Sequence, residues 1–392
     1  MRNKWIEPGK TIGILGGGQL GRMMALSARE MGYRVAVLDP TPDSPCGQVA
    51  DEQIIGKYDD LAAAEKLAEI CDVLTYEFEN IDSETAKWLE ENMYLPQGSN
   101  LLSITQDRIH EKKAIKSFNI PVVRYRALET ASELQQAREA LGLPAVLKTT
   151  RGGYDGKGQR IIRSNNELPA AWSEMEGSGP FILEAWVPFE HEISVIVTRS
   201  VNGEMTTFPV AENIHVKNAL HQSIVPARIS PDVEKQAIEI ATQLAESFDL
   251  IGTLAVEMFV DDDERIYVNE LAPRPHNSGH YSINSCETSQ FEQHIRAICG
   301  WPLGKTTLLK PSIMVNILGE HVDGVIENLE NLPENHLHMY GKKEARTGRK
   351  MGHITFLTDD LEKTLEAIDE SSIWKQEEET EDTEETIGGT EE

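Results

Sequence analysis

Several kinds of residue and segment are scarce in this 392-residue sequence, and each absence narrows the possible functions. No apolar run is long enough to span a bilayer, and no signal-type apolar stretch follows the first residues. The few cysteines lack the spacing of a disulfide framework or a metal site, which favours a reducing cytoplasm as the location. The four cysteines are Cys46, Cys71, Cys286 and Cys299.

Basic residues are also few. Lysine and arginine number 37 against 65 aspartates and glutamates, which gives a net charge of −28. This balance argues against nucleic acid or an anionic membrane as a partner. Nine of the acidic residues, and no basic residue, lie in residues 376–392. We therefore expect residues 375–392 to form a disordered acidic tail, to which we assign no function.

Residues 11–100 alternate strand and helix patterns, which predicts a Rossmann-like domain with a parallel sheet over residues 1–100. The first predicted strand, residues 11–15, leads through a turn at residues 16–21 into a helix over residues 19–31. This turn fits G-x-G-x-x-G, and the acidic Asp39 follows the next strand, as in dinucleotide-dependent oxidoreductases. The same turn can hold a sugar phosphate at a helix N-terminus. No hydride-transfer constellation accompanies it, so the oxidoreductase stays the minor alternative.

The loop over residues 148–159 is the strongest single signal of function. It has four glycines in seven residues, lies between predicted strands at residues 144–147 and 160–162, and is bracketed by Lys148 and Lys157. Glycines let a backbone approach a ligand closely and direct several N–H groups at one anion. The loop is not a Walker A motif, because no Gly-Lys-Ser/Thr opens a helix here. We predict a flap that closes over a polyphosphate, with a mobile hairpin as the alternative.

A hairpin with two acidic residues is the second signal. Residues 253–259 and 265–270 are predicted strands, and pairing about their turn brings Glu257 close to Asn269 and Glu270. Two carboxylates so close repel each other, which keeps one protonated unless a divalent cation binds. The oxygen ligands predict Mg²⁺, with Mn²⁺ as a substitute, shared with substrate phosphates. The alternative is a hairpin whose acids face solvent.

These features resemble the ATP-grasp superfamily over about residues 10–374, and four further motifs narrow the resemblance. The motifs are similar to those of the 5-(carboxyamino)imidazole ribonucleotide synthase family of purine biosynthesis, and they occur in that family's order. They are GGGQLGRM (16–23), YEFEN (76–80), APRPHNSGH (272–280) and RKMGH (349–353).

The resemblance implies an ATP-grasp fold of mixed α/β and α+β class, preceded by a Rossmann-like domain and followed by a small α+β domain. The implied boundaries are 1–100, 101–300 with a phosphate-loop lobe at about 120–190, and 301–374. It further implies a homodimeric ligase that uses ATP and Mg²⁺. The implied reaction joins bicarbonate to aminoimidazole ribonucleotide through carboxyphosphate. Another ATP-grasp carboxylate–amine ligase is the nearest alternative, and a nucleotide sensor would not need both metal carboxylates.

The resemblance also implies roles for individual residues. The metal would be held by Glu257, Asn269 and Glu270. The residues implied to hold ATP are Arg108, Lys148, Gly153, Tyr154, Asp155, Gly156, Lys157, Gly158, Gln159, Glu184, Ala185, Trp186, Val187, Glu192, His215, Asn269 and Glu270.

Two further groups are predicted to bind the other substrates. Five cations in residues 341–350 suit a phosphate monoester, with a solvated surface loop as the alternative. Residues 274–278 offer a cation and hydrogen-bond donors to a small oxyanion. A zinc site at His276 and His280 is less favoured, because no third ligand follows at a usual spacing. The predicted substrate residues are Gly18, Gln19, Leu20, Glu77, Arg274, His276, Asn277, Ser278, Lys342, Arg346 and Arg349, and the predicted catalytic residues are Asp155, Arg274 and Lys342.

Overall fold

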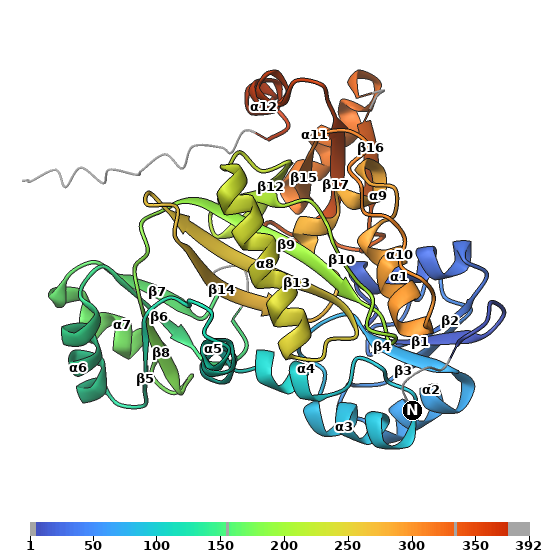
Figure 1. Ribbon diagram of the computed structural model, residues 1–392, viewed down its shortest axis with the longest axis horizontal. Coiled ribbons are helices and arrows are strands. Elements are labelled where there is room, and N and C mark those ends of the chain that lie inside the picture. The colour runs from blue at the N-terminus through green and yellow to red at the C-terminus, as the bar shows by residue number, and fades with distance from the viewer. Residues whose placement is uncertain (1–4, 154–156, 333–334, 375–392) are drawn as a thin grey trace, which may run out of the picture.

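The computed structural model describes residues 5–153, 157–332 and 335–374. It confirms the predicted mixture of α/β and α+β structure, because three sheets with their covering helices make up this part of the chain (Figure 1). In these same ranges, no helix is both long enough and apolar enough to cross a membrane. The acidic tail predicted from residue 375 lies outside the described residues.

The N-terminal unit contains the predicted parallel sheet, with its strands in the order β3-β2-β1-β4. Its strands are apolar on both faces because helices cover both sides: Ile12 and Ile14 pack with α1, whereas Ala36 and Leu38 pack with α2. The elements are β1 (Thr11–Leu15), α1 (Gln19–Glu30), β2 (Arg34–Asp39), β3 (Glu52–Ile55), α2 (Leu61–Ile70), β4 (Val73–Tyr76), α3 (Ser83–Asn92) and α4 (Asn100–Thr105).

A smaller antiparallel sheet, ordered β5-β8-β6-β7, carries the glycine-rich loop between β6 and β7. The predicted strand–loop–strand arrangement is therefore confirmed. Leu147, Ile162 and Leu183 are buried against the helices on its inner face. The elements are β5 (Tyr125–Leu128), α6 (Ala131–Leu141), β6 (Ala145–Thr149), β7 (Gln159–Ile162), the 3-10 turn η1 (Asn165–Glu167), α7 (Leu168–Met175) and β8 (Phe181–Ala185).

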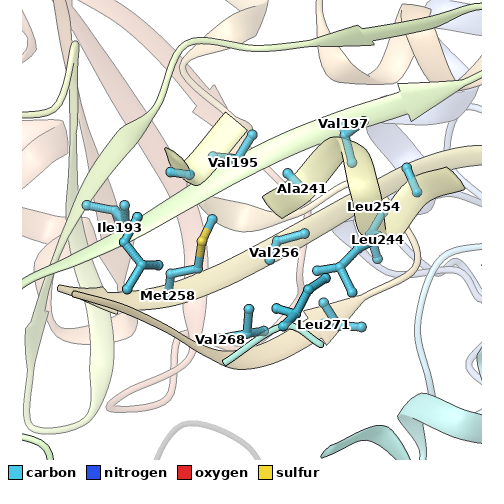
Figure 2. Packing of buried hydrophobic residues seen from close by; sticks show 14 of the residues in the cluster. Ile193, Val195, Val197, Ala241, Leu244, Leu254, Val256, Met258, Val268 and Leu271 are labelled. Atoms are coloured by element: carbon cyan, nitrogen blue, oxygen red, sulfur yellow. The ribbon is translucent and has the colours of Figure 1, made fainter. Parts of the chain in front are cut away.

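The largest sheet has nine strands in the order β14-β13-β9-β11-β12-β15-β17-β16, with β10 beside β9. Alternate residues of its strands, among them Val195 and Val256, point toward Ala241 and Leu244 of α8 and form the main core (Figure 2). The elements are α5 (Arg108–Ser117), β9 (Phe189–Arg199), β10 (Met205–Thr207), β11 (Ala211–Val216), β12 (Ala219–Val225), α8 (Pro231–Ser247), β13 (Gly252–Asp261), β14 (Ile266–Ala272), η2 (Asn277–Gly279), α9 (Ser282–Ser285) and α10 (Gln290–Cys299).

The C-terminal strands extend this sheet and do not form one of their own, because β12 pairs with β15. The strands and helix predicted within residues 301–374 are present, yet their sheet continues into the preceding unit (Figure 1). The boundary at residue 301 stays a prediction. The elements are β15 (Ser312–Leu318), η3 (Gly319–His321), α11 (Val322–Glu327), η4 (Leu329–Asn331), β16 (Asn335–Met339), β17 (Lys350–Leu357) and α12 (Leu361–Glu370).

Candidate active site

A cavity of about 720 Å³ lies where the N-terminal unit, the small sheet and the large sheet meet. This volume is typical of a site for small molecules. Most of the residues predicted from the sequence contribute to its wall. They are Gln19, Leu20, Glu77, Arg108, Lys148, Gly153, Lys157, Gln159, Glu184, Ala185, Trp186, Val187, Glu192, His215, Glu257, Asn269, Glu270, Arg274, His276, Asn277 and Ser278.

The predicted pairing of the acidic hairpin is confirmed, since Glu257 on β13 lies opposite Glu270 on β14. The register shifts just after Glu257, so Asn269 has no partner residue in this ladder. Burial and the charge of Glu270 raise the pKa of Glu257 to about 8. Burial also acts to raise the pKa of Glu270, but the guanidinium of Arg108 outweighs it and lowers that pKa. Without a metal, one carboxylate of the pair is thus protonated near neutral pH.

The same three residues fit a Mg²⁺ ion. Asn269 Oδ1 is buried and has no hydrogen-bond partner within the described ranges, as expected of an oxygen that awaits a cation. The described residues contain no group of three or more His, Cys, Asp or Glu side chains suited to a metal. Two carboxylates and an amide supply only oxygen ligands, which suit a hard cation that shares its coordination with substrate oxygens. The zinc alternative at His276 and His280 gains no support from this part of the chain.

Lys148 meets a buried carboxylate at the wall of the cavity. Its Nζ lies 2.7 Å from Glu184 Oε2, and Nζ of Lys112 on α5 lies 2.9 Å from Glu184 Oε1. Burial acts to raise the pKa of Glu184, but the two ammonium groups lower it to about 2. The Glu184 side chain therefore holds two lysines, and the residues after it, 185–187, continue the wall.

Arg108 joins the acidic hairpin to the glycine-rich loop. Asp107 accepts hydrogen bonds from the first amides of α5 and so fixes the start of the helix at Arg108. The guanidinium contacts Glu270 Oε2 at 2.8 Å and donates to the Gly153 carbonyl oxygen at 3.4 Å. Among the other loop residues predicted to bind ATP, Gly158 is not part of the wall, and Tyr154, Asp155 and Gly156 lie outside the described residues.

Aromatic side chains form part of the cavity wall. The rings of Phe189 and Phe259 stack with centroids 4.6 Å apart and 9° between their planes, and Trp186 also lines the wall. Glu192 Oε2 lies 3.1 Å from His215 Nδ1. Burial acts to lower the pKa of His215, but the bond to Glu192 raises it overall. Aromatic side chains with a carboxylate in the same wall suit a nucleobase with its ribose.

The glycine turn of the N-terminal unit is filled from within the protein. Gly18 and Gly21 donate their N–H groups to the carboxylate of Glu77, and Gly17 donates to Asp39 Oδ2 at 2.7 Å. A Cβ atom on Gly18 would lie 2.6 Å from Glu77 Oε1, so glycine makes room for this carboxylate. A pyrophosphate would have to displace Glu77 from these amides. This geometry argues against the dinucleotide alternative, and Gly18 itself is not part of the cavity wall.

The segment after β14 presents its polar groups to the cavity. Arg274 Nη2 lies 2.5 Å from Glu79 Oε1 of the N-terminal unit. The Ser278 N–H donates to His276 Nδ1 at 3.3 Å, so the other ring nitrogen, Nε2, carries hydrogen and faces Glu257 Oε1 at 3.1 Å. The guanidinium and this oriented imidazole lie beside the metal ligands, where a small oxyanion would be activated.

The structure does not bring Lys342, Arg346 and Arg349 into the cavity wall. Lys342 Nζ donates to the Lys350 carbonyl oxygen at 2.7 Å, and Arg349 Nη1 donates to the Glu344 carbonyl oxygen at 3.0 Å. Arg346 pairs with the Glu344 side chain. These cations are thus turned toward their own segment, because its carbonyl and carboxylate groups lie within reach. Their role with a substrate phosphate stays a prediction.

Some residues of the wall escaped prediction from the sequence. Lys350, at the start of β17, is the cation of the 341–350 cluster that does line the cavity, and it belongs to the RKMGH motif. Phe259 also lines the wall and follows Glu257 by two residues, so strand alternation places both on one face. Asn213, by contrast, comes from β11, for which the sequence offered no chemical signal.

Comparison with protein families gives three matches along the chain. Residues 9–106 match the ribonucleotide synthetase preATP-grasp domain, and residues 113–291 match the ATP-grasp domain. Residues 312–367 match the phosphoribosylaminoimidazole carboxylase C-terminal domain.

Comparison with individual proteins gives similarity over nearly the whole chain. An N5-carboxyaminoimidazole ribonucleotide synthase of Bacillus subtilis (strain 168) is 57% identical over 94% of this chain and 97% of its own. The crystal structure of an N5-carboxyaminoimidazole ribonucleotide synthetase with ADP is 59% identical in sequence with a TM-score of 0.93. The match covers 95% of this chain and 98% of that one. An Aspergillus clavatus N5-carboxyaminoimidazole synthase, solved with ADP and 5-aminoimidazole ribonucleotide, is 31% identical with a TM-score of 0.85. Here the match covers 92% of this chain and 96% of that one.

Proposed function

Because the chain belongs to the N5-carboxyaminoimidazole ribonucleotide synthase family of ATP-grasp ligases, we propose how its cavity performs that family's reaction. The enzyme uses ATP with Mg²⁺ to carboxylate aminoimidazole ribonucleotide in purine biosynthesis. The observation that carries the proposal is one cavity that contains Lys148, both hairpin carboxylates and the Arg274 segment. The identity of 57% with the Bacillus subtilis enzyme supports the assignment.

The nucleotide is proposed to bind with its adenine beside Trp186, Phe189 and Phe259, and its ribose near Glu192. Its phosphates then lie beneath the glycine-rich loop, where the cations of Lys148 and Arg108 compensate their charge. Phosphoryl transfer depends mainly on positioning and charge stabilisation, which this arrangement provides. Glu257, Asn269 and Glu270 would hold Mg²⁺, which neutralises charge on the terminal phosphates when bound.

Bicarbonate is proposed as the carboxyl donor, held by Arg274 and by His276 beside the metal ligands. One bicarbonate oxygen attacks the γ-phosphorus in line, the bond to the β-phosphate oxygen breaks, and ADP leaves. The product of this step is carboxyphosphate. Lys350 supplies a further positive charge to the wall of the cavity on this side. Closure of the loop excludes water, which would otherwise hydrolyse the intermediate.

The ribonucleotide is proposed to bind at the N-terminal unit, near Gln19, Leu20 and Glu77, whose residues form that side of the cavity. Its amine nitrogen attacks the carboxyl carbon, phosphate leaves, and the nitrogen loses a proton. Asp155 is proposed to orient the amine or accept this proton, although it lies outside the described residues. Replacement of Asp155 with Asn should lower kcat more than either substrate KM, and normal turnover would remove this role.

The test of the function measures ADP release with ATP and Mg²⁺, with bicarbonate and aminoimidazole ribonucleotide added separately and together. Release should require both. If formate or an amino acid replaces bicarbonate with equal efficiency, the enzyme is a different carboxylate–amine ligase. Release that ignores the ribonucleotide would also exclude the proposed reaction.

We further propose that the enzyme is a cytoplasmic homodimer. The basis is the family resemblance, together with cysteines that are all free in the structure. Light scattering of the purified enzyme should give twice the mass of the 43.8 kDa chain. A monomeric mass across the working concentration range would contradict the dimer.

A further inference from the structure

Lys112 on α5 is a fully buried lysine that takes no part in the cavity wall. Its side chain is 1% exposed, and its Nζ contacts Glu184 Oε1 at 2.9 Å and the Asn269 carbonyl oxygen at 3.1 Å. Lysine is rarely buried to this degree unless a partner compensates its charge. Here the partner, Glu184, is itself buried and also bonded to Lys148.

One face of α5 holds three consecutive residues of the metal-binding strand. Arg108 contacts the Glu270 carboxylate, Glu111 accepts the Leu271 N–H at 2.8 Å, and Lys112 donates to the Asn269 carbonyl oxygen. Residues 108, 111 and 112 share a helix face because they are three and four positions apart. The helix thus fixes β14 at the residues that the metal and the nucleotide require.

The charges around Glu184 explain why a second lysine is needed. If Lys148 were the sole partner of Glu184, the carboxylate would cancel most of the field that the ammonium exerts on nearby phosphates. With Lys112 on the other oxygen, the three groups together carry one net positive charge. Of the two lysines, only Lys148 lines the cavity, together with Glu184, so the net positive charge of the three groups lies at the cavity wall.

We propose that Lys112 is a positioning residue that neutralises Glu184, and so leaves the charge of Lys148 available to the phosphates of ATP. This proposal rests on the function proposed above, because it presumes that Lys148 faces a nucleotide polyphosphate. Lys112 acts through Glu184 and does not touch the nucleotide.

The test compares Lys112→Met with Lys113→Met. The neighbouring Lys113 is exposed, so its replacement makes the same change in charge without touching Glu184. In Lys112→Met we expect the KM for ATP to rise roughly 10-fold or more, with the KM for the ribonucleotide within about twofold of wild type. Lys113→Met should leave both constants unchanged. Equal kinetics in the two variants would contradict the role of Lys112. The proposed function would instead be contradicted by a wild-type enzyme whose ADP release does not depend on bicarbonate, so the two failures are distinguishable.

The double variant Lys112→Met with Glu184→Gln separates charge from packing. It removes the carboxylate together with its compensating lysine, so the KM for ATP should return to within about fivefold of wild type. A purely structural role of Lys112 at the Asn269 carbonyl predicts no such recovery. If Lys112→Met does not fold, the double variant decides alone. Recovery supports the proposal, while an unrecovered KM or an unfolded double variant overturns it.

Discussion

The two facing carboxylates of the hairpin, Glu257 and Glu270, lead to a prediction about metal binding. Because the pKa of Glu257 is raised to about 8, its carboxyl group is mainly protonated at neutral pH when no metal is bound. Glutamine has nearly the same shape as a protonated glutamate. A Glu257→Gln replacement should therefore change the metal-free protein little, while it removes a ligand from the loaded enzyme.

We accordingly predict that Glu257→Gln lowers kcat/KM by about 100-fold or more, because a metal ligand contributes several kcal/mol to phosphoryl transfer. Its thermal unfolding in the presence of a chelator should match that of wild type. Asp262→Asn, in the exposed turn of the same hairpin, is the matched control and should retain activity. Full activity of Glu257→Gln would show that this carboxylate binds no metal.

His294 gives a prediction about pH. The Thr253 N–H donates to its Nδ1, so Nε2 carries the hydrogen that bonds Thr75 Oγ1 at 2.8 Å, and the ring is neutral. Burial lowers the pKa of His294 to about 3. Between this value and the unfolded pKa of about 6.5, the unfolded chain binds the extra proton, so stability falls as the pH falls through this window.

Because of His294, the free energy of unfolding should fall by up to about 1.4 kcal/mol for each pH unit below pH 6.5. Urea unfolding measured from pH 7 to pH 5 checks it. In His294→Gln the dependence on pH should be shallower, whereas replacement of the exposed His110 by Gln should leave it as in wild type. Identical slopes for both variants would contradict the assignment of the proton to this site.

Residue-level prediction from the sequence succeeded where chemistry and local spacing coincide. Glu257 and Glu270 lie on one hairpin, so counting from the turn was enough to pair them. The partnership of Lys112 with Glu184 was not predictable, because it depends on the tertiary arrangement that brings a side chain of α5 to one of β8. The sequence could also not distinguish Lys350 from Lys342, since only the direction of each side chain separates them.

At the scale of elements, α8 and the strands beneath it form the support of the hairpin. Leu244 is fully buried between α8 and the strands of the main core (Figure 2). We predict that Leu244→Ala destabilises the protein by about 2–5 kcal/mol, through lost burial and a residual cavity. Lys235→Ala, on the exposed side of the same helix, should change the free energy of unfolding by less than about 0.5 kcal/mol. Denaturant unfolding measures both values, and equal small effects would show that α8 carries little of the core.

Element existence was largely predictable, but the path of the large sheet was not. The patterns of β1, β2 and β13 were plain, because alternation and apolar runs are local properties. The pairing of β12 with β15 joins segments far apart in the chain, and no local pattern encodes it. That the strands predicted within residues 301–374 continue the large sheet could therefore not be read from their own sequence.

At the scale of the whole molecule, contacts between units place the substrates relative to one another. The Arg274 guanidinium pairs with Glu79 of the N-terminal unit at 2.5 Å. We predict that Glu79→Gln lowers kcat by roughly 10-fold with little change in the KM for ATP, because Arg274 loses the charged partner that orients it. Glu84→Gln, exposed on the same unit, is the control. Steady-state kinetics with each substrate varied in turn will show the separation, and a parallel rise in the ATP KM would argue for a general loss of structure.

The hydrogen bonds between the glycine turn and Glu77 also matter for assigning functions to other sequences that carry the same glycine pattern. A search for G-x-G-x-x-G alone would assign chains like this one to the nicotinamide or flavin enzymes, because residues 16–21 match the whole pattern. Glu77, the residue that follows β4, accepts hydrogen bonds from the turn amides and occupies the place that a coenzyme phosphate would take at this helix N-terminus. An acidic residue immediately after the fourth strand is thus a simple filter that would remove such false assignments.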